Sequence, residues 1–352
     1  MKPIAVTLGD PAGIGPEIIA KAFRDHAELM RGCFVAGDIA CLRRGACAVQ
    51  GGGADLPVAV IAAPAEALDV PPRCIPLLQV VHVVQWQALP PIGRVSAAAG
   101  RIAADCVTWA ARAALRGELA ALVTAPLNKE ALAAAGVPFP GHTELLQAEA
   151  AAHLGRTIND VPVRMMLASD ELRTVLVSIH VSLREAVDAV TFDSVLQSLR
   201  IAHESLWAVL GRRPLLAVAG LNPHAGEGGL FGREELDFII PAVLAAQAEG
   251  IDACGPFAPD TVFMRARSTR ARAGEFDAVV AMYHDQGLIP VKYLGVDKGV
   301  NVTLGLPLVR TSPDHGTAFD IAGSGVADAS SLLQAVLMAR QLAARPDRFR
   351  AV

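Results

Sequence analysis

The chain has 352 residues, a length that predicts about two domains of roughly 150 residues each. Hydrophobic residues make up 53% and charged residues 19%, which is enough apolar material for a large buried core. A net charge of −4, without any run of five or more basic residues, excludes nucleic acid as a main partner. No apolar stretch reaches the roughly 20 residues of a membrane span, and Met1 leads directly into a predicted strand, so we expect a cytoplasmic protein without a membrane partner.

The first predicted element is a short apolar strand at Pro3–Gly9, followed by a glycine-rich turn and a helical pattern. Pro16 and Glu17 are typical of the first turn of a helix. Such a turn can bind an anion, because free N–H groups and the helix dipole face it. It lacks the Lys–Ser/Thr pair of a P-loop and the third glycine of the dinucleotide fingerprint, so a purely structural turn is an equal alternative.

The next predicted elements are strands at Cys33–Gly37, Leu56–Ala62 and Ala120–Thr124 and a long helix at Ser96–Leu115. The proline-rich region 64–95 has no clear pattern. Pro126 ends the third of these strands. Thr124, Asn128 and Lys129 either line a cleft at the carboxyl end of that strand or belong to a plain turn.

His142 and Thr143 follow two prolines and a glycine and stand at the start of the next helical pattern. We predict that Thr143 is the N-cap of this helix. The apolar runs Val161–Ala168 and Leu172–Ile179 then predict a β-hairpin, and Phe192–Leu210 predicts a helix.

A histidine follows the end of a predicted apolar strand at His180, His224 and His284. Taken singly, a histidine at a strand end more often has a structural role. Together, at one edge of one sheet or on two facing sheets, the three imidazoles could complete a site for zinc, cobalt, nickel or manganese. The spacing is too wide for a compact zinc finger, so the fold itself would have to assemble the site.

Polar residues concentrate in the segment Ala281–Arg310. The adjacent imidazole and carboxylate of His284 and Asp285 suit a divalent metal. Lys292 and Arg310 suit a phosphate or a carboxylate, and Asn301 can orient a ligand hydroxyl. No GxSxG motif and no suggestive cysteine context indicate a covalent nucleophile.

Several segments together resemble the 4-hydroxythreonine-4-phosphate dehydrogenase family of vitamin B6 synthesis: GDPAGIGPE, TAPLNK, PGHTE, LNPHAGEGG, MYHDQG, GVNVTLGLP and RTSPDHGTAFDIAG. The resemblance implies two α/β/α domains with a cleft between them, as in the isocitrate and isopropylmalate dehydrogenases, and a homodimer with a shared active site. We expect a discontinuous first domain of residues 1–137 plus 306–352, and a second domain of residues 138–305 with the metal histidines and the dimer contacts. The implied reaction is the oxidation of 4-phosphooxy-L-threonine with NAD, followed by decarboxylation to 3-amino-2-oxopropyl phosphate; NADP stays open as the cofactor.

The resemblance also assigns roles to residues. The metal ligands for Zn, Co, Mg or Mn, drawn from both protomers, would be His180, His224 and His284. The substrate contacts would be His142, Thr143, Lys292, Asn301 and Arg310. The adenine-side cofactor loop would include His315, Gly316, Thr317 and Asp320. The candidates for catalytic proton transfer are Asp285, which could instead orient a histidine, and Lys292.

Other functions stay open at this stage. Relatives in the same superfamily act on D-threonate or D-erythronate 4-phosphate, and extra length at residues 150–161 beside the PGHTE segment could alter the pocket for such a substrate. The resemblance disfavours a dihydrodiol substrate, because that branch of the superfamily lacks the GHTE and GVNVTLGLPLVR patterns, and their retention here, with His142, Asn301 and Arg310, implies a phosphorylated substrate. A catalytically idle metal- or phosphate-binding protein and a phosphate acyltransferase on a related scaffold are the remaining alternatives.

Overall fold

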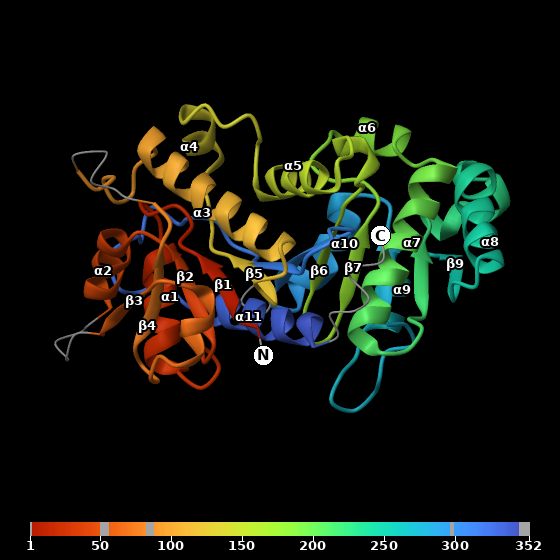
Figure 1. Cartoon of the computed structure of the whole chain (residues 1–352). Helices are drawn as coiled ribbons and strands as arrows, with labels where there is room; N and C mark the ends of the chain where they lie inside the picture. Colours follow the sequence, from red (N-terminus) through yellow and green to blue (C-terminus); the bar gives the residue numbers. More distant parts are fainter. Residues whose placement is uncertain (1, 50–55, 82–87, 296–298, 345–352) are drawn as a thin grey trace. The chain divides into compact units, whose positions relative to one another are not determined.

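The computed structural model describes residues 2–49, 56–81, 88–295 and 299–344, and most of its helices and strands are labelled in Figure 1. The chain divides into two compact units. Among the described residues, unit 1 contains those up to Pro162 and again those from Leu306 to Ala344, and unit 2 contains those between Val163 and Gly305. Each unit has a β-sheet with helices, so the predicted α/β class is confirmed. The predicted domain boundaries stay a prediction; by the structural division, His142 and Thr143 belong to unit 1.

The sheet of unit 1 has the strand order β3-β4-β2-β1-β5-β12. The strands are β1 (Ile4–Thr7), β2 (Cys33–Gly37), β3 (Val58–Ile61), β4 (Ile75–Gln79), β5 (Ala121–Thr124) and β12 (Arg310–Pro313). All these pairs are parallel, and β1, β2 and β5 are buried along their whole length. Their continuous apolar runs follow from burial on both faces, as in other parallel sheets.

The helices of unit 1 are α1 (Gly15–Asp25), α2 (Ile39–Ala48), α3 (Ala97–Leu115), α4 (Lys129–Ala134), α5 (His142–Leu154) and α11 (Ser330–Ala343), with short 3₁₀ helices at Pro64–Leu68 and Ile158–Asp160. Helix α3 begins as predicted, because the Ser96 side chain accepts a hydrogen bond from the Ala99 N–H at 3.2 Å. The N-cap of α5 is Gly141, without a side-chain cap, so the prediction of Thr143 as N-cap was wrong. Thr143 is the second helical residue.

The sheet of unit 2 has the order β11-β6-β7-β10-β8-β9 and mixes strand directions. Its strands are β6 (Arg164–Ala168), β7 (Arg173–Leu176), β8 (Leu216–Ala219), β9 (Ala253–Phe257), β10 (Ala278–Ala281) and β11 (Val300–Leu304). Strands β6 and β7 form the predicted antiparallel hairpin, and β11 is antiparallel to β6. Strands β7, β10, β8 and β9 are parallel, so the carboxyl ends of β7, β8 and β10 lie at one edge of the sheet.

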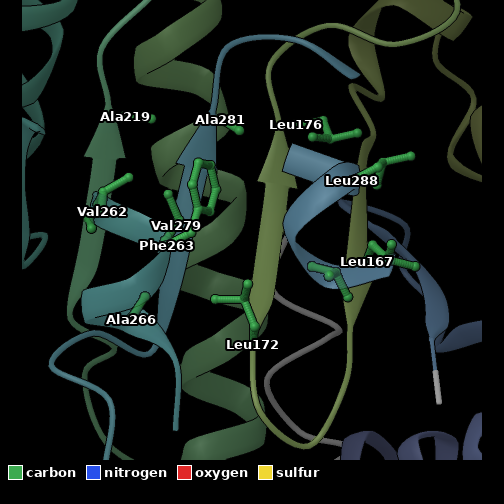
Figure 2. Packing of buried hydrophobic residues seen from close by; sticks show 12 residues of the cluster. Leu167, Leu172, Leu176, Ala219, Val262, Phe263, Ala266, Val279, Ala281 and Leu288 are labelled. Atoms are coloured by element: carbon green, nitrogen blue, oxygen red, sulfur yellow. The ribbon is translucent and has the colours of Figure 1, made fainter. Parts of the chain in front are cut away.

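The helical elements of unit 2 are α6 (Leu183–Asp188), α7 (Phe192–Leu210), α8 (Ile240–Ala248), α9 (Val262–Ala266) and α10 (His284–Tyr293), with a 3₁₀ segment η4 (Pro223–Gly229) and a π-helical segment η5 (Glu235–Ile239). Figure 2 shows the buried cluster in which Leu288 of α10 lies with Leu167 and Leu176 of the hairpin. A side chain at Gly287 would clash with Leu176, so the glycine allows α10 to pack closely on β7. This packing fixes the helix that begins at His284.

No helix among the described residues is both long enough and apolar enough to cross a membrane.

Candidate active site

Two of the predicted metal ligands of unit 2, His180 and His284, lie side by side. His180 follows β7, and His284 follows β10 as the first residue of α10. The Val177 N–H donates to the Ala281 carbonyl at 2.9 Å, and the Ser178 hydroxyl donates to the Met282 carbonyl at 2.9 Å, which holds the two strand ends together. The ring centroids of His180 and His284 are 5.7 Å apart, with an angle of 43° between the ring planes.

The arrangement of these two imidazoles fits a shared divalent ion. Two imidazoles that bind one ion through nitrogens about 2.1 Å from it have ring centroids roughly 5 to 6 Å apart. The Nδ1 of His284 lies 2.7 Å from Oδ1 of Asp285. A carboxylate that accepts a hydrogen bond from one ring nitrogen fixes the tautomer and leaves the other, here Nε2, to act as a ligand. His180 is exposed and His284 is half-buried, so both rings are accessible.

The third predicted ligand, His224, lies in a loop of unusual backbone conformation. His224, Ala225 and Glu227 have φ angles of 53°, 53° and 44°, and the intervening Gly226 also has a positive φ. The buried carboxylate of Glu235 anchors the start of this loop, because its Oε1 accepts the N–H groups of Leu221 and Asn222, each at 2.7 Å. The His224 ring is exposed and lies 6.2 Å from the Phe231 ring, centroid to centroid.

The structure does not add His224 to the pair of His180 and His284. Within the described residues, no group of three or more His, Cys, Asp or Glu side chains is close enough to hold a metal ion. Gln286 nevertheless links the two regions: its Oε1 accepts the Met282 N–H at 2.7 Å and its Nε2 donates to the Gly220 carbonyl at 2.7 Å. The end of β10 is therefore tied to the end of β8, from which the His224 loop starts.

In unit 1, Arg310 is held at the carboxyl end of β5. Its Nε and Nη2 donate to the Thr124 hydroxyl at 3.1 and 2.7 Å. Burial lowers the pKa of Arg310 to about 10, and the carboxylate of Glu144 opposes this shift. The guanidinium therefore stays charged at neutral pH, and a buried cation of this kind attracts an anionic ligand.

His142 lies close enough to Arg310 to be affected by its charge. Burial lowers the pKa of His142 well below its usual value of 6.5, and the Arg310 charge lowers this pKa further, whereas a hydrogen bond with the Ala125 backbone opposes both effects. Its imidazole is therefore neutral at pH 7. The Nε2 atom is buried and has no hydrogen-bond partner among the described residues, so it is available to a ligand.

The predicted cofactor residues lie in one segment of unit 1, between β12 and α11. Thr317 is buried, and its carbonyl accepts a hydrogen bond from the Ile14 N–H at 3.0 Å. Gly316 and Asp320 are exposed. The Nδ1 of His315 lies 3.0 Å from the Gly316 carbonyl, and its Nε2 is buried without a partner among the described residues.

The remaining predicted substrate residues lie on helices and on a strand. Thr143 and Lys292 are half-buried, the first in the first turn of α5 and the second in the last turn of α10. Asn301 is half-buried on β11, opposite Leu167 of β6.

Residues that hold the candidate site in place were missed by the sequence analysis. The carboxylates of Glu17 and Glu235 are both buried and both accept backbone N–H groups. Their only sequence signal was their position in or near the first turn of a helix, where acidic residues are common on the surface. Gln286 has no sequence signal beyond its position in the polar segment Ala281–Arg310.

Comparisons with known proteins show what the whole chain is similar to. A family model described as "Pyridoxal phosphate biosynthetic protein PdxA" matches residues 29–339. A 4-hydroxythreonine-4-phosphate dehydrogenase of Beijerinckia indica subsp. indica is 52% identical over 331 residues, which cover 94% of this chain and 92% of that protein. A D-threonate 4-phosphate dehydrogenase of Salmonella typhimurium is 43% identical and covers 97% of this chain and 99% of its own. The crystal structure of a 4-hydroxythreonine-4-phosphate dehydrogenase from Klebsiella pneumoniae has a TM-score of 0.84 at 43% identity, covering 97% of this chain and 98% of its own.

Proposed function

The chain belongs to the PdxA family of pyridoxal phosphate biosynthetic proteins, and from this membership we propose that it oxidises 4-phosphooxy-L-threonine with NAD. Hydride leaves the carbon that bears the C3 hydroxyl, and the resulting β-keto acid loses carbon dioxide to give 3-amino-2-oxopropyl phosphate. The observation that carries the proposal is the pair of His180 and His284, placed at neighbouring strand ends with ring centroids 5.7 Å apart. We propose that the protein performs this reaction in the cytoplasm.

His180 and His284 are the proposed in-chain ligands of a divalent ion, and Zn, Co, Mg and Mn are the candidates. Such an ion would supply Lewis-acid chemistry, lowering the pKa of the substrate hydroxyl and stabilising the negative charge that develops as carbon dioxide leaves. The contact of Asp285 with His284 Nδ1 favours a role for this carboxylate in orienting the ligand rather than in proton transfer. Lys292 is then the stronger candidate for moving the hydroxyl proton.

Arg310 is the proposed anchor for an anionic group of the substrate. Its planar guanidinium matches the oxygens of a phosphate or a carboxylate, and the Thr124 hydroxyl fixes the plane from two of its nitrogens. The neutral His142 suits a hydrogen bond from a substrate hydroxyl to its buried Nε2. Thr143 and Asn301 are further proposed polar contacts to the substrate.

A dehydrogenase of this family uses a nicotinamide cofactor, and we propose NAD, bound at the segment that includes His315, Gly316, Thr317 and Asp320. The exposed carboxylate of Asp320 supports NAD over NADP, because a carboxylate can accept a hydrogen bond from a ribose hydroxyl and repels a phosphate there.

We further propose that the active unit is a homodimer with a shared site, in which His224 completes the metal site of the partner protomer. The apolar side chains beside His224 support this proposal: Leu230 is 73% exposed and Phe231 is 48% exposed. Leu244 and Phe238, in the elements that follow, are also exposed. Burial of such side chains against a second copy would stabilise the association.

A second candidate substrate is D-threonate 4-phosphate or D-erythronate 4-phosphate. The proposal has support from the Salmonella typhimurium relative, whose printed name gives D-threonate 4-phosphate and which matches this chain over nearly its whole length. The same histidines and the same arginine would serve this substrate, because it carries the same phosphate and a comparable hydroxyl.

The experiment that tests the proposal compares kcat/KM for NADH formation with 4-phosphooxy-L-threonine, D-threonate 4-phosphate and D-erythronate 4-phosphate at one fixed metal concentration. We expect the first substrate to be preferred by at least about tenfold, which corresponds to about 1.4 kcal/mol of differential transition-state binding. A preference of that size for either sugar acid would replace the first proposal by the second. Absence of NADH with all three would refute both.

A further inference from the structure

The carboxylate of Glu17, near the start of α1, is almost completely buried, with 1% of its surface exposed. Its Oε1 accepts a hydrogen bond from the Ala327 N–H at 2.9 Å, and its Oε2 accepts one from the Gly323 N–H at 3.2 Å. The Nζ of Lys21, one turn along the helix, lies 3.7 Å from Oε1 and also donates to the Ala327 carbonyl. A buried carboxylate requires such partners, so Glu17 and the backbone at residues 323–327 hold each other in place.

The turn that precedes α1 contacts the other end of the same segment. The Ile14 N–H donates to the Thr317 carbonyl at 3.0 Å. A Cβ atom at Gly13 would lie 2.8 Å from both the Cβ and the carbonyl oxygen of Thr317, so only glycine allows this approach. Residues 13–17 therefore fix the segment 317–327 at both of its ends.

These contacts decide between the two interpretations of the glycine-rich turn. Three of its N–H groups already have partners: Ala12 donates to Asp10 Oδ1 at 2.8 Å, Gly13 donates to the Asp10 carbonyl at 3.0 Å, and Ile14 donates to Thr317. An anion would have to break these bonds to bind there. These bonds favour the structural interpretation of the turn, as a support for the neighbouring segment, over a phosphate cradle.

We propose that Glu17 is a positioning residue for the cofactor, which holds the backbone of residues 317–327 in the conformation that binds the dinucleotide. This inference rests on the proposed function, in which that segment is the adenine-side loop. The solvent exposure of the residues supports this inference. Glu17 and Thr317, which hold the two ends of the segment, are buried, whereas Asp320 between these ends is exposed. Glu17 does not touch the cofactor in this account and acts only through the loop.

The test is the variant Glu17→Gln, which keeps the shape of the side chain but replaces one acceptor oxygen by an amide nitrogen. We expect the Kd for NADH, measured by fluorescence titration, to rise by roughly tenfold, because one charge-assisted hydrogen bond is lost and an N–H group is left opposite a donor. The KM for NAD should rise in parallel, whereas kcat at saturating NAD and the KM for the phosphorylated substrate should change by less than about threefold.

The matched control is Glu66→Gln. Glu66 also accepts a backbone hydrogen bond, from the Ala62 N–H at 3.0 Å, but it is exposed. This variant should bind NADH as the wild type does. Hydrogen exchange of the Gly323 and Ala327 amides should accelerate in Glu17→Gln and not in the control, which links the change in affinity to the loop.

The outcomes separate this inference from the proposed function. A wild-type protein that binds no NADH would refute the proposed function and this role together. NADH binding by the wild type that Glu17→Gln leaves unchanged would refute the role of Glu17 alone, as would an equal loss of affinity for the phosphorylated substrate. If Glu17→Gln does not fold, Lys21→Met decides: it removes the ammonium group from the same cluster, and weaker NADH binding supports the inference while unchanged binding refutes it.

Discussion

At the scale of single residues, the candidate site depends on backbone conformations that residue types alone do not reveal. His180 and His224 have φ angles of 47° and 53°, in the left-handed region that costs a residue with a Cβ about 1–2 kcal/mol. The surrounding contacts, such as those of Glu235 with the start of the His224 loop, must offset this cost. The sequence therefore predicted which histidines are candidate ligands, but not the backbone conformations that hold their side chains.

Thr124 gives a prediction about substrate binding. The variant Thr124→Val removes the acceptor of two Arg310 hydrogen bonds while keeping the shape of the side chain. The KM for the phosphorylated substrate should rise by roughly tenfold, because the guanidinium loses its fixed orientation. Thr261→Val is the control, since the Thr261 hydroxyl is exposed and bonds only within its own turn. Equal KM values for the two variants in steady-state kinetics would contradict this role of Thr124.

His142 gives a prediction about pH. Its pKa in the folded protein lies well below 6.5, so the unfolded chain binds a proton that the folded chain does not as the pH falls below 6.5. The folded state therefore loses stability below about pH 6.5, with a slope approaching 1.4 kcal/mol per pH unit for this group, until the folded pKa is reached. Urea unfolding at pH 7.5 and pH 5.5 should show a smaller loss of stability on acidification in His142→Gln than in the wild type. The exposed His153 on the same helix provides the control, and His153→Gln should keep the wild-type pH dependence.

At the scale of elements, the apolar pattern located many strands and helices, but it gave no strand at β9 or β11 and no helix at α2, α8 or α9. The hairpin of β6 and β7 and the helices α3 and α7 are where alternating or helical periodicity placed them, within a few residues. Strand β4 was missed inside the proline-rich region, and β12 was missed because its sequence, RTSP, is polar. The burial of β12 comes from its pairing with β5 and its packing against α11, which no local pattern records. This is also why Arg310 could be named as an anion ligand, and Thr124 as a cleft residue, while the hydrogen bonds between them could not be predicted.

Gly100 gives a prediction at this scale, in which two effects have opposite signs. Glycine within a helix costs about 1 kcal/mol relative to alanine, so helix propensity alone would make Gly100→Ala stabilising. A Cβ at this position would, however, clash with the backbone carbonyl of Ala131 at the contact of α3 with α4. We expect the clash to dominate, with a loss of about 1–3 kcal/mol in the free energy of unfolding measured in urea. The control is Thr108→Ala on the same helix, which should not be destabilising by this mechanism. A Gly100→Ala variant more stable than the wild type would contradict the prediction, because it would show that α3 and α4 can move apart without a cost in free energy.

At the scale of the whole molecule, the sequence predicted the α/β class. It also predicted three histidines as metal ligands, because each of them follows a predicted strand. The structure supplies a physical basis for two of them, because β7 and β10 are parallel neighbours whose carboxyl ends meet. His224 follows β8, the next strand, but its loop turns through left-handed conformations and leaves the ring exposed. A single chain cannot reveal a ligand that a second chain provides, which is the reason the shared site stays a proposal.

The proposed shared site predicts that two inactive variants complement each other. His224→Ala and His284→Ala should each be inactive as homodimers. In a mixed dimer, His180 and His284 of the first variant would meet His224 of the second, so one intact site forms in each mixed dimer. Unfolding and refolding the two variants together in equal amounts should therefore restore about a quarter of wild-type turnover, as random pairing of a symmetric dimer requires. If one chain supplied all three ligands, the mixture would stay inactive.

The measurement that tests the central claim most directly is NADH formation from 4-phosphooxy-L-threonine by the purified protein before and after removal of divalent metal with a chelator. The account predicts that turnover disappears on chelation and returns when Zn, Co, Mg or Mn is added back. In His284→Ala, adding the same metals should not restore turnover. Turnover that survives complete removal of the metal would contradict the role given to His180 and His284. A protein that forms no NADH from this substrate with any of these metals would contradict the assignment of the substrate itself.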